Sequence, residues 1–299
     1  MSADSSLSKW LNYLDQRGKS PHTLAAYRRA VNHFIKWDRA TYGQGFDPAR
    51  VIPRDVRDWK SHQQTTQRAA PTTINQRLSA LSKYFEWCII QGIREDNPVA
   101  EINGLSLPTI RPKALSRADE RRFVREAHAG RDRRDIAIIE LLLATGIRVD
   151  ELLSLRVGDV VTRERSGLVI VREGKGGNYR EIPLAIDARK AADRYKAAGH
   201  PDPGNPDSAL FHGQRGPLKD RSAVYRMLGV YAQLAKLDKF GPHVLRHTFA
   251  VRYLERRRKE GDTDALILRD LAYLLGHKDI KTMMIYTAPT LDDLVKRVE

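Results

Sequence analysis

The sequence predicts a mainly α-helical protein with a small β-hairpin, divided into an all-helical unit and a larger α+β unit. Three observations carry this prediction. Apolar residues recur at helical spacing over most of the 299 residues. Two strand-like runs, 167–171 and 179–184, flank the glycine-rich turn 174–177. Residues 103–115 contain glycine and proline without periodicity, which is typical of a linker.

The first unit, residues 1–107, is expected to be entirely helical. Its apolar residues form helical patterns in four segments, and Ser20 before Pro21 predicts a capped helix with proline in its first turn. Residues 108–115 are then expected to link this unit to a second one, residues 116–299.

The second unit is expected to combine the hairpin with further helices. One helix is predicted over residues 135–145 with Gly146 as its C-cap, and a short one over 149–155. Another helix begins at Pro242. The segment after Pro289 is amphipathic but too short to be stable alone, so we expect it to dock on its own domain or on a neighbouring subunit.

The composition indicates a globular protein of the cytoplasm. The chain is 41% hydrophobic and 30% charged. No apolar run approaches the roughly 20 residues of a membrane span, and the N-terminal residues lack the basic and apolar regions of a signal peptide. Cys88 is the single cysteine, which excludes an intramolecular disulfide framework and fits a reducing compartment. We therefore expect no membrane partner.

The charge balance points to a polyanionic partner. Lys and Arg outnumber Asp and Glu by 52 to 37, which gives a formal net charge of +15. An excess of this size is typical of proteins that bind nucleic acid. It does not distinguish an enzyme from a passive binder.

The segment from Gly241 to His247 is the strongest candidate site. His243, Arg246 and His247 share one face of the predicted helix because they are three and four positions apart. They are also expected in its first turn, where backbone N–H groups and the helix dipole favour an anion. Two imidazoles and a guanidinium in this position predict a phosphate-binding site.

Two other interpretations of this segment are open. His243 and His247 have the spacing of a metal-binding pair, but the zinc-protease motif has glutamate after its first histidine, where this chain has Val244. Arg246 on the same face would repel a dication, so metal is the weaker alternative. The segment could also be a histidine-rich core helix without a catalytic role.

Several residues together meet the demands of phosphoryl transfer from DNA without a metal. Two arginines, such as Arg148 and Arg246, can clamp the phosphate oxygens and neutralise charge in the transition state. A lysine such as Lys175 can protonate the leaving alkoxide. A tyrosine such as Tyr286 can attack if its phenol, with an ordinary pKa of ~10, is activated. Taken singly, Arg148 could equally be the salt-bridge partner of Glu151, and a lysine in a hairpin turn is common.

Residues 116–299 resemble the catalytic domain of the tyrosine recombinases, the phage-integrase and Xer family. Residues 144–152, with the sequence ATGIRVDEL, resemble the first-arginine box, and residues 242–250, PHVLRHTFA, resemble the second. Leu275-Gly276-His277 with Tyr286 nine positions after His277 resembles the third. The hairpin segment 174–184, which contains Lys175 and Arg180, resembles the hairpin that carries the family's lysine.

The resemblance implies a role for each residue around the phosphate. Arg148 and Arg246 would bind the scissile phosphate, and His277 would form a hydrogen bond with it. His243 would assist proton transfer at the nucleophile.

The remaining roles follow from the same resemblance. Tyr286 would attack and leave a 3′-phosphotyrosyl link, while Lys175 would act as general acid for the 5′-hydroxyl. Glu151 would support the first-arginine box, and His247 would pack beneath the site. Because the covalent link keeps the phosphodiester energy, the resemblance implies no cofactor, no ATP and no metal.

The first unit resembles the family's helical, SAM-like core-binding domain, which closes with the catalytic domain as a clamp around DNA. The chain begins directly with this unit, so we expect a simple Xer-like or small mobile-element recombinase. The resemblance implies a cytoplasmic, nucleoid-associated homo-tetramer on two double-stranded recombination sites, with the C-terminal segment passed to the next subunit. A monomer in free solution and accessory proteins are compatible with it.

The expected function is therefore a site-specific DNA recombinase that serves integration, excision or resolution of a mobile element or chromosome dimer. Two alternatives belong to other classes. One is a nicking and closing enzyme similar to type IB topoisomerases, and the other is a non-catalytic DNA-binding regulator.

Overall fold

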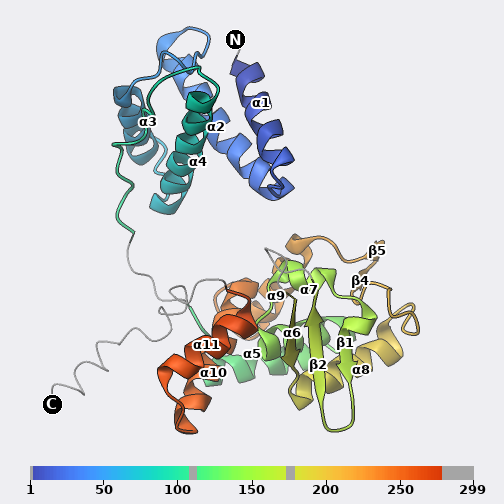
Figure 1. Cartoon of the computed structure of the whole chain (residues 1–299). Helices are drawn as coiled ribbons and strands as arrows, with labels where there is room; N and C mark the ends of the chain where they lie inside the picture. Colours follow the sequence, from blue (N-terminus) through green and yellow to red (C-terminus); the bar gives the residue numbers. More distant parts are fainter. Residues whose placement is uncertain (1–2, 108–112, 173–178, 278–299) are drawn as a thin grey trace, which may run out of the picture. The chain divides into compact units, whose positions relative to one another are not determined.

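The computed structural model describes residues 3–107, 113–172 and 179–277. The chain divides into two compact units, Met1–Ile110 and Arg111–Glu299 (Figure 1). Each unit has a hydrophobic core of its own.

Four helices form the described part of the first unit: α1 (Ala3–Gln16), α2 (Pro21–Tyr42), α3 (Pro53–Thr65) and α4 (Pro71–Ile90). Proline lies in the first turn of α2, α3 and α4, where a missing N–H leaves no helical hydrogen bond unmade. Ser20 caps α2, because its hydroxyl accepts a hydrogen bond from the backbone N–H of Thr23. The helices predicted for this unit are all present.

Aromatic rings hold these helices together. Phe34 of α2 is fully buried, and its ring centroid lies 5.1 Å from that of Trp59 on α3 and 6.4 Å from that of Phe85 on α4. Both pairs meet edge to face, an arrangement that adds to the burial of apolar area. The three helices are therefore fixed to one another through a single side chain of α2.

The second unit is built around α6 (Arg133–Thr145), whose inward residues include Ile138, Ile139 and Leu142. It packs against α5 (Arg117–Ala129), α8 (Ile186–Gly199) and α10 (Pro242–Lys259). The other helices of the described part are α7 (Val149–Ser154), α9 (Arg221–Leu234) and α11 (Asp264–Leu275). The predicted helix over 135–145 thus forms the centre of this core.

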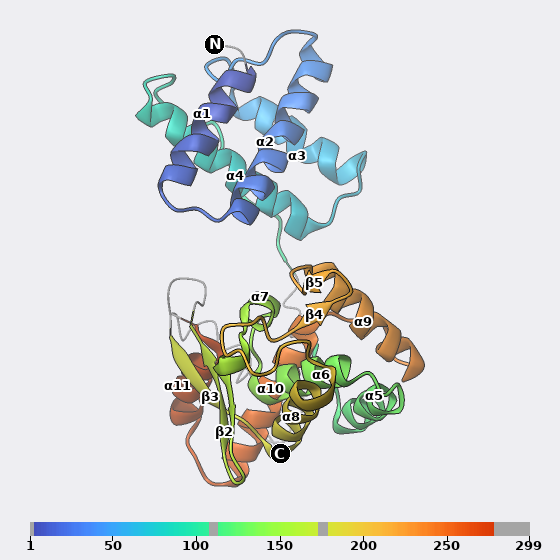
Figure 2. The same cartoon turned by 90° about the vertical axis from the view of Figure 1, so that its right-hand side faces the viewer.

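A small antiparallel sheet lies beside these helices (Figure 2). It contains β1 (Val160–Thr162), β2 (Gly167–Val171) and β3 (Arg180–Pro183), in that order. Val169 of β2 pairs with Val160 on one side and Ile182 on the other, and all three side chains are buried. The predicted pairing of the two strand-like runs is therefore correct, while the turn 174–177 lies outside the described residues.

The predicted β structure was incomplete. Strand β1 and the two-residue strands β4 (His212–Gly213) and β5 (Gly216–Pro217) are too short to leave an alternating pattern in the sequence. Helices α8 and α9 were also missed. The buried face of α8 consists mainly of alanine, which gives a weak apolar signal, and α9 has a glycine in its middle. The predicted helix after Pro289 lies outside the described residues.

Replacement of Gly146 by alanine should destabilise the protein. Gly146 has φ +61°, and a Cβ atom there would lie 2.6 Å from the Phe249 ring and 2.8 Å from Leu275. The left-handed backbone and the overpacking together predict a loss of about 2–5 kcal/mol in the free energy of unfolding. Denaturant unfolding would measure it.

Gly229→Ala is the matched control, because Gly229 lies in α9 with no neighbouring atom within 4 Å of a new Cβ. It should stabilise the helix by about 0.5–1 kcal/mol. Equal changes in the free energy of unfolding for Gly146→Ala and Gly229→Ala would contradict the strain and overpacking expected at Gly146.

Candidate active site

Four predicted site residues, Arg148, Glu151, Arg246 and His277, meet at the C-terminal end of α11. The helix ends at Gly276, which has φ +63° and ψ 48°. The N–H of Gly276 donates to the carbonyl of Tyr273 at 3.0 Å, and that of His277 to the carbonyl of Ala272 at 2.9 Å. This is the Schellman pattern, which turns the chain sharply and pairs the carbonyls of Tyr273 and Ala272 but not those of Leu274, Leu275 and Gly276.

Three arginines from three different elements donate to those carbonyls. The contacts are Arg180 Nε to Leu274 O at 2.9 Å, Arg246 Nη2 to Leu275 O at 2.7 Å, and Arg148 Nη2 to Gly276 O at 3.2 Å. The negative end of the helix dipole attracts these cations. As a result, Arg148 and Arg246 bind adjacent carbonyl groups and lie side by side.

Glu151 is the buried carboxylate of this cluster, with 3% of its surface exposed. Its oxygens accept hydrogen bonds from the Arg148 backbone N–H at 2.8 Å and from Arg148 Nη1 at 3.0 Å. They also accept from Arg180 Nη1 at 3.2 Å and Nη2 at 2.8 Å. Burial alone would raise the pKa of Glu151, but the hydrogen bonds and charges of Arg180 and Arg148 hold it below its ordinary value. Glu151 therefore stays ionised and orients Arg148.

Arg246 is almost fully buried. It is 5% exposed, and besides Leu275 it binds the carbonyl of Gly146 through Nη1 at 2.7 Å. Gly146 ends α6 in a left-handed conformation, two residues before Arg148. The same turn thus presents Arg148 to the site and supplies an acceptor for Arg246.

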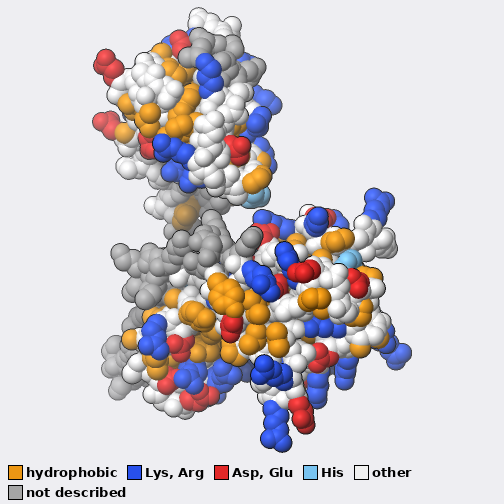
Figure 3. Space-filling view, turned by 45° about the vertical axis from the view of Figure 1, so that its right-hand side comes forward, with side chains coloured by type: hydrophobic (Ala, Val, Ile, Leu, Met, Phe, Trp, Pro, Cys, Tyr) orange, Lys and Arg blue, Asp and Glu red, His pale blue; other side chains and the backbone are white. Residues whose placement is uncertain are grey.

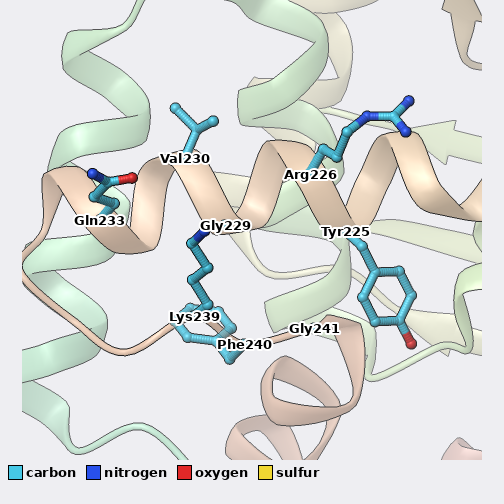
Figure 4. A pocket seen from close by; sticks show the side chains of 8 residues that line it. All are labelled: Tyr225, Arg226, Gly229, Val230, Gln233, Lys239, Phe240 and Gly241. Atoms are coloured by element: carbon cyan, nitrogen blue, oxygen red, sulfur yellow. The ribbon is translucent and has the colours of Figure 1, made fainter.

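The start of α10 corrects one detail of the prediction. Because the helix begins at Pro242, His243 lies in its first turn, whereas Arg246 and His247 lie in the second. Arg246 therefore points its guanidinium at the ends of α6 and α11 rather than capping the N-terminus of its own helix. Figure 4 shows Tyr225 of α9 pointing toward Gly241, where a Cβ would lie 2.3 Å from the Tyr225 ring. A side chain at Gly241 would therefore collide with Tyr225.

The histidines of the site are neutral at physiological pH. Burial and the charges of Arg246, Arg148 and Arg180 lower the pKa of His277 to about 4. His277 Nε2 lies 2.8 Å from Arg246 Nη2, so Nε2 accepts and the ring proton is on Nδ1. Partial loss of water and the charges of Arg246 and Arg148 also lower the pKa of His243. The half-buried His247 has a pKa lowered to about 4 by burial and by its neighbours His243 and Arg246.

These surroundings bear on the alternative of a metal pair at His243 and His247. Within residues 3–107, 113–172 and 179–277, no group of three or more His, Cys, Asp and Glu side chains is arranged to hold a metal ion. Arg246 lies in the same cluster and lowers the pKa of both histidines. The guanidinium groups of Arg148, Arg180 and Arg246 outnumber the single carboxylate of Glu151, so this cluster carries a net positive charge.

Two predicted site residues cannot be placed. Lys175 and Tyr286 lie outside the described residues. By contrast, the buried position of Arg180 was not predicted, although the sequence held a signal for it. Arg180 and Ile182 are two positions apart in a strand, so they face the same side of the sheet, and both are buried.

Comparison with known proteins identifies the family of the chain. The model of the phage integrase family matches residues 113–292, and that of the phage integrase N-terminal SAM-like domain matches residues 7–92. The tyrosine recombinase XerC of Thermodesulfovibrio yellowstonii is 30% identical over 97% of this chain and 93% of its own length.

Two solved structures share the fold. The XerH site-specific recombinase bound to palindromic difH substrate has a TM-score of 0.75 at 20% identity, over 99% of this chain and 84% of its own. A lambda integrase tetramer bound to a Holliday junction has a TM-score of 0.68 at 21% identity, over 93% and 78% of the two chains. The chain therefore belongs to the phage integrase family of tyrosine recombinases, and it is an enzyme of site-specific recombination.

Proposed function

We propose that this recombinase breaks and rejoins duplex DNA through a covalent link to Tyr286. The observation that carries the proposal is the pair Arg148 and Arg246 on the adjacent carbonyls of Gly276 and Leu275. A phosphodiester offers the same oxygen acceptors with a full negative charge, and charge-assisted hydrogen bonds are the stronger ones. Both guanidinium groups can therefore turn from the helix end to the scissile phosphate.

The proposed reaction transfers the phosphoryl group from DNA to the enzyme and back. The Tyr286 oxygen attacks phosphorus, the bond to the 5′ oxygen breaks, and Lys175 gives that oxygen a proton. His243, neutral because of its lowered pKa, assists removal of the phenol proton. A 5′-hydroxyl of the partner strand then reverses these steps. The phosphodiester energy is kept in the 3′-phosphotyrosyl bond, so the proposed reaction requires neither ATP nor a metal.

Other residues support the phosphate site. The proton on Nδ1 of His277 is a donor for a phosphate oxygen, because Nε2 accepts from Arg246. Glu151 fixes Arg148 and offsets part of the positive charge. His247, half-buried and neutral, packs behind His243 in the second turn of α10. Each of these roles is a proposal that rests on the contacts given above.

The two parts of the chain have different proposed tasks. Residues 1–107 would bind the core recombination site, residues 108–115 would link, and residues 116–299 would catalyse, so that the two domains close on double-stranded DNA as a clamp. The net charge of +15 supports binding to DNA. On the face drawn in Figure 3, Lys and Arg side chains are spread over both units.

We further propose a homo-tetramer on two sites, with the segment after Pro289 passed to the neighbouring subunit. The tetrameric lambda integrase that shares this fold supports it. The free protein would be a monomer in the cytoplasm, associated with the nucleoid on binding DNA, and accessory proteins are compatible with the proposal. No described helix is both long and apolar enough to cross a membrane.

The alternatives differ from this proposal in what they predict. A type IB topoisomerase-like enzyme is not favoured, because the likeness to XerC extends over 97% of the chain. A topoisomerase would also act without bringing two sites together. A non-catalytic regulator would bind DNA but form no covalent link.

Replacement of Tyr286 by phenylalanine should abolish covalent capture of DNA. The nicked suicide substrates would be drawn from DNA flanking the gene, and the denatured products would be separated on a gel. Wild type should give a slow-moving protein–DNA band in EDTA, and Tyr286→Phe should give none at the same DNA affinity, because the hydroxyl is the nucleophile. A band that persists in Tyr286→Phe assigns the nucleophile to another residue.

Replacement of Arg246 by lysine should slow covalent capture by about 100- to 1000-fold, the usual effect of removing one donor from a developing charge. Lysine cannot reproduce the guanidinium contacts with Gly146, Leu275 and His277. Single-turnover capture rates would test this. Arg252→Lys is the matched control on the same helix, since Arg252 is half-exposed and paired with Glu120. A rate for Arg246→Lys equal to that of Arg252→Lys would rule out its phosphate-binding role.

The ring of His277 should stay neutral down to about pH 4. An unfolded histidine titrates near ~6.5. Between these values the unfolded chain binds a proton that the native one does not, so this group lowers stability as the pH falls from 6.5 toward 4. NMR titration of the free protein, with His277→Gln to assign the signal, would measure the pKa. Titration near the ordinary value would contradict the contact with Arg246.

A further inference from the structure

Arg180 is the arginine of the cluster that has no place in the proposed chemistry. It is 1% exposed, and both of its Nη atoms are bound to the charged carboxylate of Glu151, whereas those of Arg246 are bound to neutral carbonyls, so Arg180 is not a donor for DNA. Its nitrogens are nevertheless engaged in three directed contacts, from Nε to Leu274 O and from Nη1 and Nη2 to the two oxygens of Glu151. A buried ion pair often adds little to the free energy of folding. Stability alone therefore does not explain why Arg180 is paired with Glu151 at this site.

We propose that Arg180 is a positioning residue for strand cleavage: it holds the end of α11 and the carboxylate that orients Arg148 while phosphate binds and leaves. The inference rests on the proposed function of Arg148 and Arg246. Arg148 and Arg246 cannot hold the end of α11 themselves, because in the proposed function they turn to the phosphate.

The first step of the argument concerns the end of α11. When phosphate takes the donors of Arg148 and Arg246, the carbonyls of Gly276 and Leu275 lose their charged partners. Arg180 is not a donor for DNA and keeps its bond to Leu274 throughout. It therefore anchors the helix end from which the chain continues to Tyr286, eleven residues after Leu275.

Gly276 shows how closely this anchor fits. A Cβ atom at Gly276 would lie 2.8 Å from Arg180 Nη1 and 3.0 Å from its Cζ. The guanidinium thus packs directly against the left-handed turn that precedes His277. A displacement of Arg180 would move this turn, and with it the ring that contacts Arg246.

The second step concerns Glu151, which connects Arg180 to Arg148. Each carboxylate oxygen accepts one bond from each arginine: Oε1 from the two Nη1 atoms, and Oε2 from the Arg148 N–H and Arg180 Nη2. The charged or titratable groups that face Glu151 are Arg148 before α7, Arg180 of β3 and His277 after α11. Without Arg180, burial would favour the protonated acid, which would release one of its bonds to Arg148.

The position of Arg180 in the chain supports the same role. It is the first residue of β3, and Lys175 precedes it by five positions. One side chain thus joins β3, the α7 start and the end of α11. These elements carry or adjoin the proposed general acid, one phosphate-binding arginine and the segment of the nucleophile.

The test compares Arg180→Met and Arg180→Lys with wild type. Single-turnover capture of a nicked suicide substrate would be followed across pH, together with the Kd for the same DNA. Arg180→Met should bind DNA with unchanged affinity and capture it more slowly by on the order of 100-fold, as expected for misplaced reacting groups. Its rate should fall further at acidic pH than that of wild type, because Glu151 then takes up a proton. Arg180→Lys should remove this added acid dependence and recover part of the rate.

Arg134→Met is the matched control. Arg134 is less buried than Arg180 but has the same kinds of contact, since it pairs with Asp135 at 2.8 Å and donates to the carbonyl of His212 at 3.2 Å, and it belongs to the start of α6. It should keep the wild-type capture rate and pH profile. If Arg180→Met does not fold, Arg180→Lys carries the test through its lower rate at unchanged affinity.

The outcomes separate the two proposals. A wild-type protein without a Tyr286-dependent band overturns the proposed function. With that band present, a wild-type rate and pH profile in the Arg180 variants overturns the positioning role. Two further results would overturn the positioning role, because each would indicate a general role in folding. One is a loss of DNA affinity in Arg180→Met that matches its loss of capture rate. The other is the same slow, acid-sensitive capture in Arg134→Met.

Discussion

The site depends on the last carbonyl groups of α11, which lie beyond those that its Schellman turn pairs. A helix end in the interior needs donors from elsewhere, and here they are the guanidinium groups of Arg148, Arg180 and Arg246. Each arginine comes from a different element, so one helix end collects residues that lie far apart in the chain. The need to satisfy buried backbone oxygens thus also assembles a cationic site.

In the proposed function, the same contacts keep these cations ready for a phosphate oxygen. A carbonyl carries a partial charge, whereas a phosphate oxygen carries a larger one, so exchange of one for the other needs little reorganisation. Glu151 prevents the arginines from repelling one another, and the neutral histidines add donors and acceptors without adding charge. Burial strengthens the interactions between these charges. It also lowers the pKa of His247 and His277.

Two glycines set the geometry. Gly146 ends α6 and Gly276 ends α11, both with positive φ; Gly146 lies two residues before Arg148, and Gly276 directly before His277. Side chains at either position would meet close neighbours, Phe249 at Gly146 and Arg180 at Gly276. Glycine at both positions therefore permits the sharp turns and the close packing that place the ends of α6 and α11 within reach of Arg246.

The sequence by itself determined the helical class, the hairpin, the caps at Ser20 and Gly146, and the residues proposed for phosphoryl transfer, because periodicity, capping and motif spacing are local properties. It did not determine strand β1, the alanine-faced helix α8, the second-turn position of Arg246 or the burial of Arg180. Those features depend on partners distant in the chain: Val169 pairs with Val160, α6 covers α8, and Arg180 binds Glu151 and Leu274. Tertiary structure decided them because buried polar groups and weakly apolar surfaces take their preferred state from whatever packs against them.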